Sequence, residues 1–448
     1  MPKLRITMRT RLRGGTRAAS APSSRGLGEL RDPAFWTFMY FVAAMISFRL
    51  PGGDVAIVAS LLLVGMRAAH LRWLSVLTLL SLFVGWCLLS ALASAYRQVA
   101  IDQSIVLVKL LLVSIVAANV LTSVYRIRVF LGVVLGFFLL FPVRGAIQNY
   151  LFGYALFGRA IWNYAYANPN DLAAYAIVFS GFAGALSALA STRWVRVAGI
   201  GSIIVLQVLV LMTQSRAAIL ASAFTFMVLA ILRLRNLRVG VAILGLSAGV
   251  VALAPATMWT RIGGLKNVSI ESGMRGVDAE GSAEQRFQLM KIAAMISRDY
   301  PILGVGPGAY AKKHAEYAIS GKAVDLRLSG GERDAHNTFL RVSAETGVLG
   351  LVLFCLAVGR SLVRALRPGI AGRAPGHWAM LALGLSLMGY LIAGLFGSYP
   401  YINVLYLLLV LIAALEREAV VRGVTAIRPG RPRVRRAALP LRQQPLGA

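Results

Sequence analysis

The chain has 448 residues, of which 58% are hydrophobic and 14% are charged, and its mean hydropathy is +0.71. These values exclude an ordinary soluble domain and favour a protein embedded in a membrane. The net charge of +30 would suit a nucleic-acid-binding protein only if the basic residues gathered on one soluble face, whereas here they punctuate apolar runs. Cys87 and Cys355 both lie in apolar segments, so neither a disulfide framework nor a cysteine zinc site is expected.

The first apolar stretch, from about 35 to 48, follows a polar, arginine-rich start and is not followed by a small-residue cleavage site. We therefore interpret it as a retained first span rather than a removable signal peptide. A helix needs roughly 20 apolar residues to cross the hydrocarbon core, fewer when flanking residues snorkel. On this basis the sequence predicts twelve spans, at about 34–49, 53–66 (the shortest), 71–95, 103–123, 127–147, 170–190, 194–212, 216–233, 238–255, 343–363, 377–396 and 400–417.

The positions of lysine and arginine predict the orientation of these spans, because cytoplasmic connections carry an excess of both. With the amino terminus inside, most basic residues fall in inside connections and in the two tails. We expect both termini in the cytoplasm. The predicted parts are a basic tail at 1–33, a first membrane bundle of about nine helices at 34–255, an extracytoplasmic loop at 256–342, three last membrane helices at 343–417, and a basic tail at 418–448.

Two outer connections are too long to be simple turns. The first runs from about 143 to 169, and the second, from about 256 to 341, is the largest soluble-looking stretch of the chain. Within the second, residues 283–298 alternate apolar and polar side chains at helical spacing and end at Asp299-Tyr300-Pro301. This pattern predicts an amphipathic helix on the membrane surface.

Four histidines occur, and one of them is placed for chemistry. His336 lies in the stretch D-A-H-N, directly before an apolar run, so it falls at a helix start near the outer membrane surface. The positive end of the helix dipole disfavours a charged ring there and favours a neutral base. The alternative is a capping or solvated loop histidine. His314 is expected on a solvated face, and His70 and His377 are expected in cytoplasmic loops.

Outward-facing arginines form the second group of candidates. Arg216 follows Thr213, Gln214 and Ser215 at the junction of two predicted spans. A cation at a helix start is unfavourable by about 0.3–1 kcal/mol, which an anionic ligand such as a phosphate would offset. The alternative is an arginine that snorkels to anchor the span end. Arg286 on the expected surface helix and Arg159 in the first outer loop are, singly, ordinary loop charges.

Three other polar features predict structure rather than chemistry. The glycines between 304 and 308 are interrupted by Pro307 and follow no strand, so they predict a turn rather than a nucleotide loop. Glu345 follows His336 by nine residues, roughly 180° around a continuous helix, and so cannot orient that imidazole directly. The carboxylates show no metal-ligand spacing, so nothing in the sequence requires a divalent ion.

The stretch from Asp334 to Leu351, D-A-H-N-T-F-L-R-V-S-A-E-T-G-V-L-G-L, resembles the signature of the bacterial O-antigen ligase and polymerase superfamily. Three further stretches agree with that family in order: Arg159–Asn170, Thr213–Ala218, and Arg286 followed by the turn P-I-L-G-V-G-P-G at Pro301–Gly308. One departure is that the family often has a tryptophan shortly after the loop arginine, where this chain has Leu289 and Met290.

The resemblance implies an all-α polytopic protein of the bacterial inner membrane, of glycosyltransferase-C type, that acts at the periplasmic face and has the extracytoplasmic loop at 256–342 as its catalytic loop. The implied donor is a glycan on undecaprenyl diphosphate, and the implied acceptor is lipid A core or another glycan. His336 then corresponds to the base that deprotonates the acceptor hydroxyl, and Arg216 and Arg286 correspond to the arginines that hold the diphosphate. Arg159, Asn170 and Asn337 are the candidate substrate-binding residues, and neither a metal nor another cofactor is implied.

Three functions remain open at the level of sequence. A ligase would move a finished polysaccharide to lipid A core, or to a protein, whereas a polymerase would join carrier-linked repeat units, and the motifs barely separate the two. A transporter or flippase would also suit twelve spans. Against the transporter, the candidate polar residues collect at one membrane face rather than at the midplane.

Overall fold

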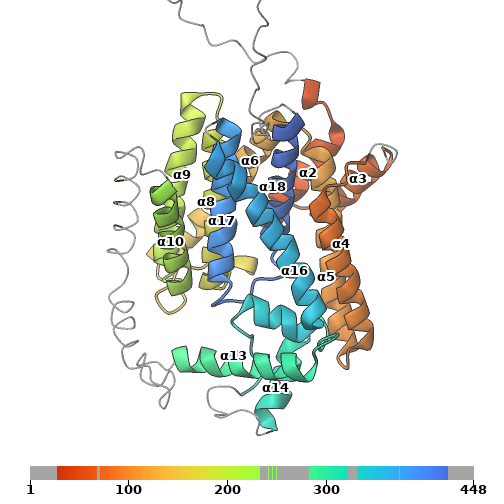
Figure 1. The fold of residues 1–448 in the computed structure, drawn as a ribbon. Coiled ribbons are helices and arrows are strands. Elements are labelled where there is room, and N and C mark those ends of the chain that lie inside the picture. The colour runs from red at the N-terminus through yellow and green to blue at the C-terminus, as the bar shows by residue number, and fades with distance from the viewer. Residues whose placement is uncertain are drawn as a thin grey trace, which may run out of the picture.

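The computed structural model of the protein describes residues 28–67, 71–232, 282–320, 330–372 and 374–421, together with the single residues 241, 245 and 249. Most of both basic tails, His70, most of the predicted ninth span and most of the loop that follows it lie outside these residues, so the expectations about them stay predictions. The described part of the chain is a bundle of helices, with one further helix lying across one end of the bundle and a short helix beside it (Figure 1).

The described residues contain helices and no β-strand, and Leu156 and Arg159 form an isolated bridge. This confirms the predicted all-helical class for the described part of the chain. The helices are α2 (Pro33–Ser47), α3 (Gly53–Gly65), α4 (Ser75–Ala93), α5 (Arg97–Val120), α6 (Val124–Phe138), α7 (Arg144–Leu151), α8 (Pro169–Ala188), α9 (Arg193–Met212), α10 (Arg216–Leu232), α13 (Ser282–Asp299), α14 (Tyr310–Ile319), α16 (Thr338–Ala371), α17 (Pro375–Ala393) and α18 (Asn403–Val421), with a π-helix, η2 (Leu139–Val143), between α6 and α7 and a 3₁₀ turn, η3 (Tyr164–Tyr166).

Seven helical segments are long and apolar enough to cross a membrane: α4, α5, the continuous α6–α7 segment, α8, α9, α16 and α17. Three shorter apolar helices, α2, α3 and α10, also coincide with predicted spans. Helix α18 lies at the predicted last span, and every side chain from Val404 to Leu415 is buried. A helix that is apolar and buried on all sides belongs at the centre of a bundle. The positions of these apolar segments agree with the sequence, and the total of twelve crossings stays a prediction.

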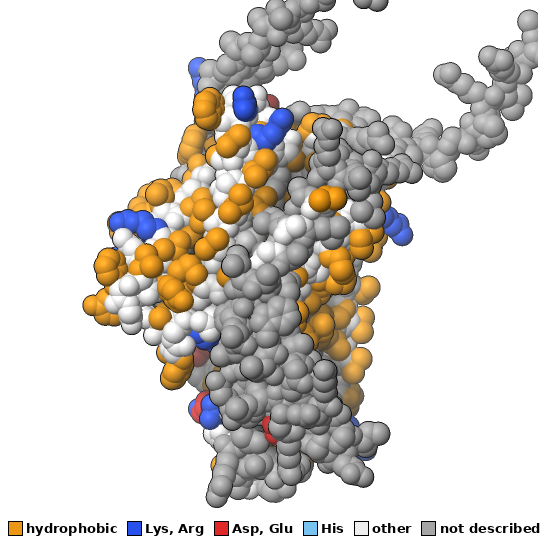
Figure 2. Space-filling model, turned by 90° about the vertical axis from the view of Figure 1, so that its left-hand side faces the viewer, with side chains coloured by type: hydrophobic (Ala, Val, Ile, Leu, Met, Phe, Trp, Pro, Cys, Tyr) orange, Lys and Arg blue, Asp and Glu red, His pale blue; other side chains and the backbone are white. Residues whose placement is uncertain are grey.

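Ion pairs gather at one end of the bundle, where α2 begins and α18 ends. Asp32 pairs with Arg67 at 2.8 Å and with Arg126 at 2.9 Å, and Glu418 pairs with Arg72 at 3.5 Å. We call this end the basic end, and the compartment that it faces stays a prediction. Hydrophobic side chains cover much of the coloured left-hand part of the face drawn in Figure 2.

At the opposite end, α13 and α14 lie across the bundle (Figure 1). Leu289, Ile292, Ala293 and Ile296 of α13 are buried, while Lys291 is exposed. Apolar residues at this spacing form one face of a helix. The amphipathic helix predicted at 283–298 is thereby confirmed as α13, whose bounds differ by one residue at each end.

Helix α16 bends sharply at Gly347, which has φ 69° and ψ −173°. The turn Pro301–Gly308 fits against this bend. Its Val305 and Gly306 N–H groups donate to the carbonyls of Ala344 and Glu345, both at 2.9 Å, and Val348 N–H donates to Pro301 at 2.8 Å. The glycine run predicted to be a turn is therefore confirmed as one, and it satisfies backbone groups that the bend leaves without helical partners. The same turn joins α13 to α14, so it fixes α13 against the first part of α16.

Candidate functional site

His336 sits in a strained turn directly before α16. Its φ of 48° is left-handed, which is uncommon for a residue other than glycine. Asn337 caps the helix: its side-chain oxygen accepts from the N–H groups of Phe339 and Leu340, both at 3.0 Å, and its amide donates to the carbonyl of Leu395 at 3.1 Å. These bonds hold the backbone next to His336 in one conformation.

The surroundings of His336 keep its imidazole neutral. Burial lowers the pKa of His336, and the guanidinium groups of Arg286 and Arg333 lower it further, while the carboxylate of Asp334 acts in the opposite direction. A neutral imidazole can accept a proton near pH 7. The sequence predicted a neutral ring from the helix start alone, whereas the structure adds burial and a charged neighbour as causes.

Tyr399, in the connection between α17 and α18, lies among four charged side chains and was missed at the level of sequence. Burial raises the pKa of Tyr399, the carboxylates of Asp171 and Asp334 also raise it, and Arg286 and Arg159 lower it. Its backbone is held by a bond from its N–H to Thr338 Oγ1 at 2.9 Å and by Tyr390 Oη, which donates to its carbonyl at 2.6 Å. The phenol thus marks the place where α8, α13, the loop after α7 and the His336 turn meet.

Arg159 joins the loop after α7 to two helix starts. Its Nε donates to the carbonyl of Thr213 at 2.8 Å, and its Nη2 donates to Asn170 Oδ1 at 2.8 Å. Gln214 Nε2 donates to the carbonyl of Gly158 at 2.9 Å, which ties the same loop to the turn between α9 and α10. Arg216 is the first residue of α10, three positions after Thr213. Arg159 and Asn170 therefore hold the turn from which Arg216 projects.

The structure brings together most of the residues that the sequence singled out. The charge of Arg286 lowers the pKa of His336, and the charges of Arg286 and Arg159 both lower the pKa of Tyr399. Arg216 is linked to this group through the turn that Arg159 holds. The roles expected for these side chains stay predictions.

Behind His336, a buried network holds Asp334 in place. Arg341 pairs with Asp334 at 3.3 Å and with Glu345 at 3.0 Å, and Tyr401 Oη donates to Glu345 Oε2 at 2.5 Å. Glu345 is fully buried, so its charge depends on these partners. The described contacts of Glu345 go to Arg341 and Tyr401 rather than to His336, in line with the sequence-based expectation that it cannot orient the imidazole directly.

The expectations for His314 and His377 were wrong. His314 is fully buried in α14, with its ring perpendicular to that of Tyr310 at 5.8 Å, because this face of α14 packs inward. Neither ring nitrogen has a hydrogen-bond partner among the described residues, and burial together with Arg333 lowers the pKa of His314 to about 4, against the opposing charge of Asp334. His377 is also buried and lies in the first turn of α17 rather than in a loop.

Within the described ranges, no group of three or more histidine, cysteine, aspartate or glutamate side chains could hold a metal ion. The candidate site also contains the guanidinium groups of Arg159, Arg216 and Arg286. Arginine suits phosphate because its planar fork can donate two hydrogen bonds at once.

Residues 200–355 match the family model described as O-antigen ligase. The matched segment contains Thr213–Ala218, Arg286, the turn at Pro301–Gly308 and the His336 stretch, while Arg159–Asn170 lies before it. No curated protein matches the chain. The match supports a membrane protein with a glycan-processing function like that of O-antigen ligases.

Proposed function

Since residues 200–355 support membership of the O-antigen ligase superfamily, as the motifs predicted, we propose that the protein is a metal-independent glycan ligase. It transfers a polysaccharide from undecaprenyl diphosphate to a lipid A core acceptor. The observation that carries this proposal is a buried imidazole, His336, whose pKa the charge of Arg286 lowers, together with Arg159, whose charge acts with that of Arg286 on Tyr399 at the same end of an apolar bundle. A base next to fixed cations is what displacement of a diphosphate from a sugar requires.

In this proposal His336 is the general base. The acceptor hydroxyl oxygen attacks the anomeric carbon of the donor sugar, and its proton passes to the unprotonated ring nitrogen of His336. The bond between the anomeric carbon and the diphosphate oxygen breaks, and its electron pair leaves with the diphosphate. Attack from the face opposite the leaving group inverts the anomeric configuration. The depressed pKa of His336 supports this role because the free base is the form present at neutral pH.

Arg216 and Arg286 bind the diphosphate and stabilise the charge that develops on it. Arg159 and Asn170 contribute to substrate binding by holding the turn that carries Arg216, as their bonds to Thr213 and to each other suggest. Asn337 acts at the acceptor side mainly by fixing the turn of His336, since its amide is engaged with Leu395 and its oxygen with the helix start.

The proposal also assigns compartments and parts of the chain. The basic end, with both termini, faces the cytoplasm, and the end with α13 and α14 faces the periplasm. The parts are those expected from the sequence, with the catalytic loop between the first membrane bundle and the last three helices. The ion pairs of Arg67, Arg126 and Arg72 at one end support this orientation, because basic residues favour the cytoplasmic side.

The test incubates the purified full-length protein in detergent with a polyprenyl-diphosphate-linked glycan and, in separate reactions, with lipid A core or with carrier-linked repeat units. Transfer to the core with inversion, abolished by His336→Ala and kept by His377→Ala at the other end of the bundle, is expected. Chain growth on repeat units alone would instead assign a polymerase. A retained anomeric configuration would rule out single displacement. Lack of donor consumption by the parent protein would reject glycosyl transfer and favour transport.

A further inference from the structure

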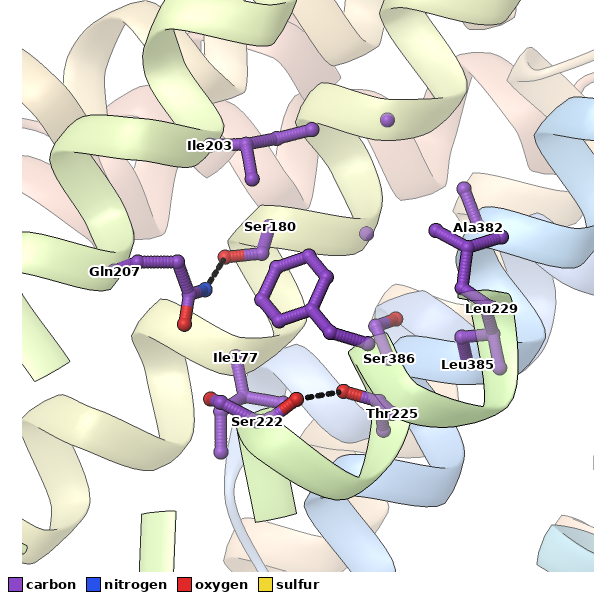
Figure 3. A pocket seen from close by; sticks show the side chains of 13 residues that line it. Ile177, Ser180, Ile203, Gln207, Ser222, Thr225, Leu229, Ala382, Leu385 and Ser386 are labelled. Atoms are coloured by element: carbon purple, nitrogen blue, oxygen red, sulfur yellow. Dashed lines mark hydrogen bonds between the residues drawn. The ribbon is translucent and has the colours of Figure 1, made fainter. Parts of the chain in front are cut away.

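Three adjoining cavities along α9 form one groove that runs away from the candidate site. Two lie between α8, α9, α10 and α17, and the third lies between α6, α9, α18 and the start of α17. The innermost, of about 120 Å³, is shown in Figure 3. It shares Gly184, Leu229, Ala382 and Leu385 with a cavity of about 780 Å³. That cavity in turn shares Ala188, Arg196 and Pro375 with a third, of about 280 Å³, at the basic end. We call the three together the α9 groove.

The length and lining of the α9 groove suit one hydrocarbon chain. Along α9 it extends from Arg196 to Gln207, eleven residues and thus about 16 Å at 1.5 Å per residue. This is about half of a hydrocarbon core of roughly 30 Å, the depth of one leaflet. Between these ends the walls are small or aliphatic, as with Gly184, Ile200 and Leu381. The middle cavity lies in the range of about 300–1,000 Å³ that is usual for ligand pockets.

The outer mouth of the groove carries positive charge. Arg196 and Arg128 line it together with Glu418, and Trp378 lines the adjoining wall. Glu418 already pairs with Arg72 at 3.5 Å. Arg196 has no ion-pair partner in the described part of the chain, unlike Arg67, which shares Asp32 with a second arginine. The mouth therefore combines the positive charge of Arg196 with a tryptophan of the kind that favours the level of lipid headgroups.

The inner end of the groove is closed by a polar wall. Gln207 Nε2 donates to Ser180 Oγ at 3.0 Å (Figure 3), and both side chains line the inner cavity. Gln207 Oε1 and Ser222 Oγ are buried there without a hydrogen-bond partner among the described residues. A hydrocarbon chain that reached further would lie against these polar atoms without offering them a hydrogen bond, which is unfavourable. The wall therefore sets a limit to the length of chain that fits.

We propose that the α9 groove binds a glycerophospholipid of net negative charge. Its phosphate lies at Arg196 and Arg128, and one acyl chain lies along Gly184, Leu381 and Leu229 toward the midplane. This site lies at the end of the bundle opposite His336, so it is separate from the proposed binding of the glycan donor. The positively charged mouth favours a lipid with an anionic headgroup. The depth of the groove favours a lipid, whose acyl chain fills it, over a free phosphate ion.

The experiment measures lipid binding to the purified full-length protein after removal of bound lipid in a nonionic detergent. Phosphatidylglycerol and phosphatidylcholine with identical acyl chains are titrated, and bound lipids are counted by native mass spectrometry. We expect tighter binding of phosphatidylglycerol. Arg196→Gln should weaken that binding about fivefold, the effect of one basic residue near an anionic lipid. Arg193→Gln, on the same helix but outside the groove lining, is the matched control and should change nothing.

Leu229→Trp keeps the charges and fills the groove where two of the cavities meet, so it should weaken binding of both lipids. This variant tests the proposal even if Arg196→Gln does not fold. Equal affinity for the two lipids, equal effects of the two arginine variants, or unchanged binding in Leu229→Trp would each overturn the proposal. Competition by inorganic phosphate alone would also overturn it, because that result would assign a phosphate site without a role for the chain.

Discussion

The bend of α16 at Gly347 makes a sharp prediction for the variant Gly347→Ala. A φ of 69° with a ψ of −173° is a conformation that essentially only glycine adopts, and residues forced into such regions cost about 1–3 kcal/mol. A Cβ at this position would also collide with the backbone carbonyls of Pro301 and Ile302. Overpacking of this kind costs typically about 1–3 kcal/mol more. The variant is therefore expected to lose on the order of 2–6 kcal/mol of stability.

The assay is thermal unfolding of the purified protein in detergent, with Gly359→Ala as the matched control. Gly359 lies in the same helix, and no atom lies within 4 Å of the position that its Cβ would take. Alanine there should be neutral or should stabilise the helix by roughly 0.5–1 kcal/mol. Both substitutions add one methyl group to the same helix. A large loss of stability in Gly347→Ala without a loss in Gly359→Ala would therefore isolate the effect of the bend.

The same substitution tests how the bend serves the site. If the turn at Pro301–Gly308 moves away from α16, α13 moves with it, and Arg286 leaves His336. Glycan transfer by the folded fraction of Gly347→Ala should then fall, while Gly359→Ala keeps parental activity. A Gly347→Ala protein that unfolds at the parental temperature and retains full activity would refute the argument that the bend needs glycine and positions the site.

Three further predictions concern the site. Arg216→Lys should lower turnover strongly, since an ammonium cannot make the bidentate phosphate contact, and full activity of this variant would contradict a clamp. Because the pKa of His336 is depressed, activity should be present above that pKa and should be lost as the pH falls through it. Arg286 lowers this pKa, so Arg286→Gln should move the acid limb of the pH–rate profile to higher pH. Asp334 raises this pKa, so Asp334→Asn should move the acid limb to lower pH. The folded protein keeps His314 neutral down to its folded pKa of about 4, whereas the unfolded chain protonates it below about pH 6.5. The stability of the fold should therefore fall by up to roughly 3 kcal/mol as the pH drops over this interval. In His314→Leu the melting temperature should fall less over the same interval.

The helices were largely predictable because burial imposes a period on the sequence. Residues 283–298 showed that period, and α13 follows it, ending where Asp299 and Pro301 predict a stop. Helix α16 begins at Thr338, at the helix start expected directly after His336, and so before the predicted membrane span at 343–363, because its first turn after Asn337 contains the charged Arg341. Asn337 caps this start.

His314 shows how a local interpretation of charges can mislead. Its charged sequence neighbours indicated a solvated face, but they lie on the other sides of a short helix. Tyr310, His314, Tyr317 and Ala318 are all buried, and their spacing of four, three and one residues is that of one helical face. That periodicity was present in the sequence, whereas the partner surface on α13 and on the loop around Ala335 was not.

The positioning residues of the site could not be predicted, because tertiary contacts create them. Tyr399 lies in a short connection that the sequence assigned only to the space between two spans. It lies next to the start of α16 because Thr338 bonds to Gly394, Gly397 and Tyr399, which holds the start of α16 against that connection. Periodicity and motifs locate side chains along the chain, but they do not show which distant connection closes over a helix start.

The pKa of His336 and the proposed binding of the diphosphate by Arg286 depend on each other. In the protein without donor, the guanidinium of Arg286 helps to keep the pKa of His336 low, so the imidazole is unprotonated but a weak base. A diphosphate bound to Arg286 would offset that positive charge and raise the pKa of His336. The base would then gain strength only when the leaving group is in place, and one arginine would serve both to hold the donor and to make the acceptor's proton easier to remove.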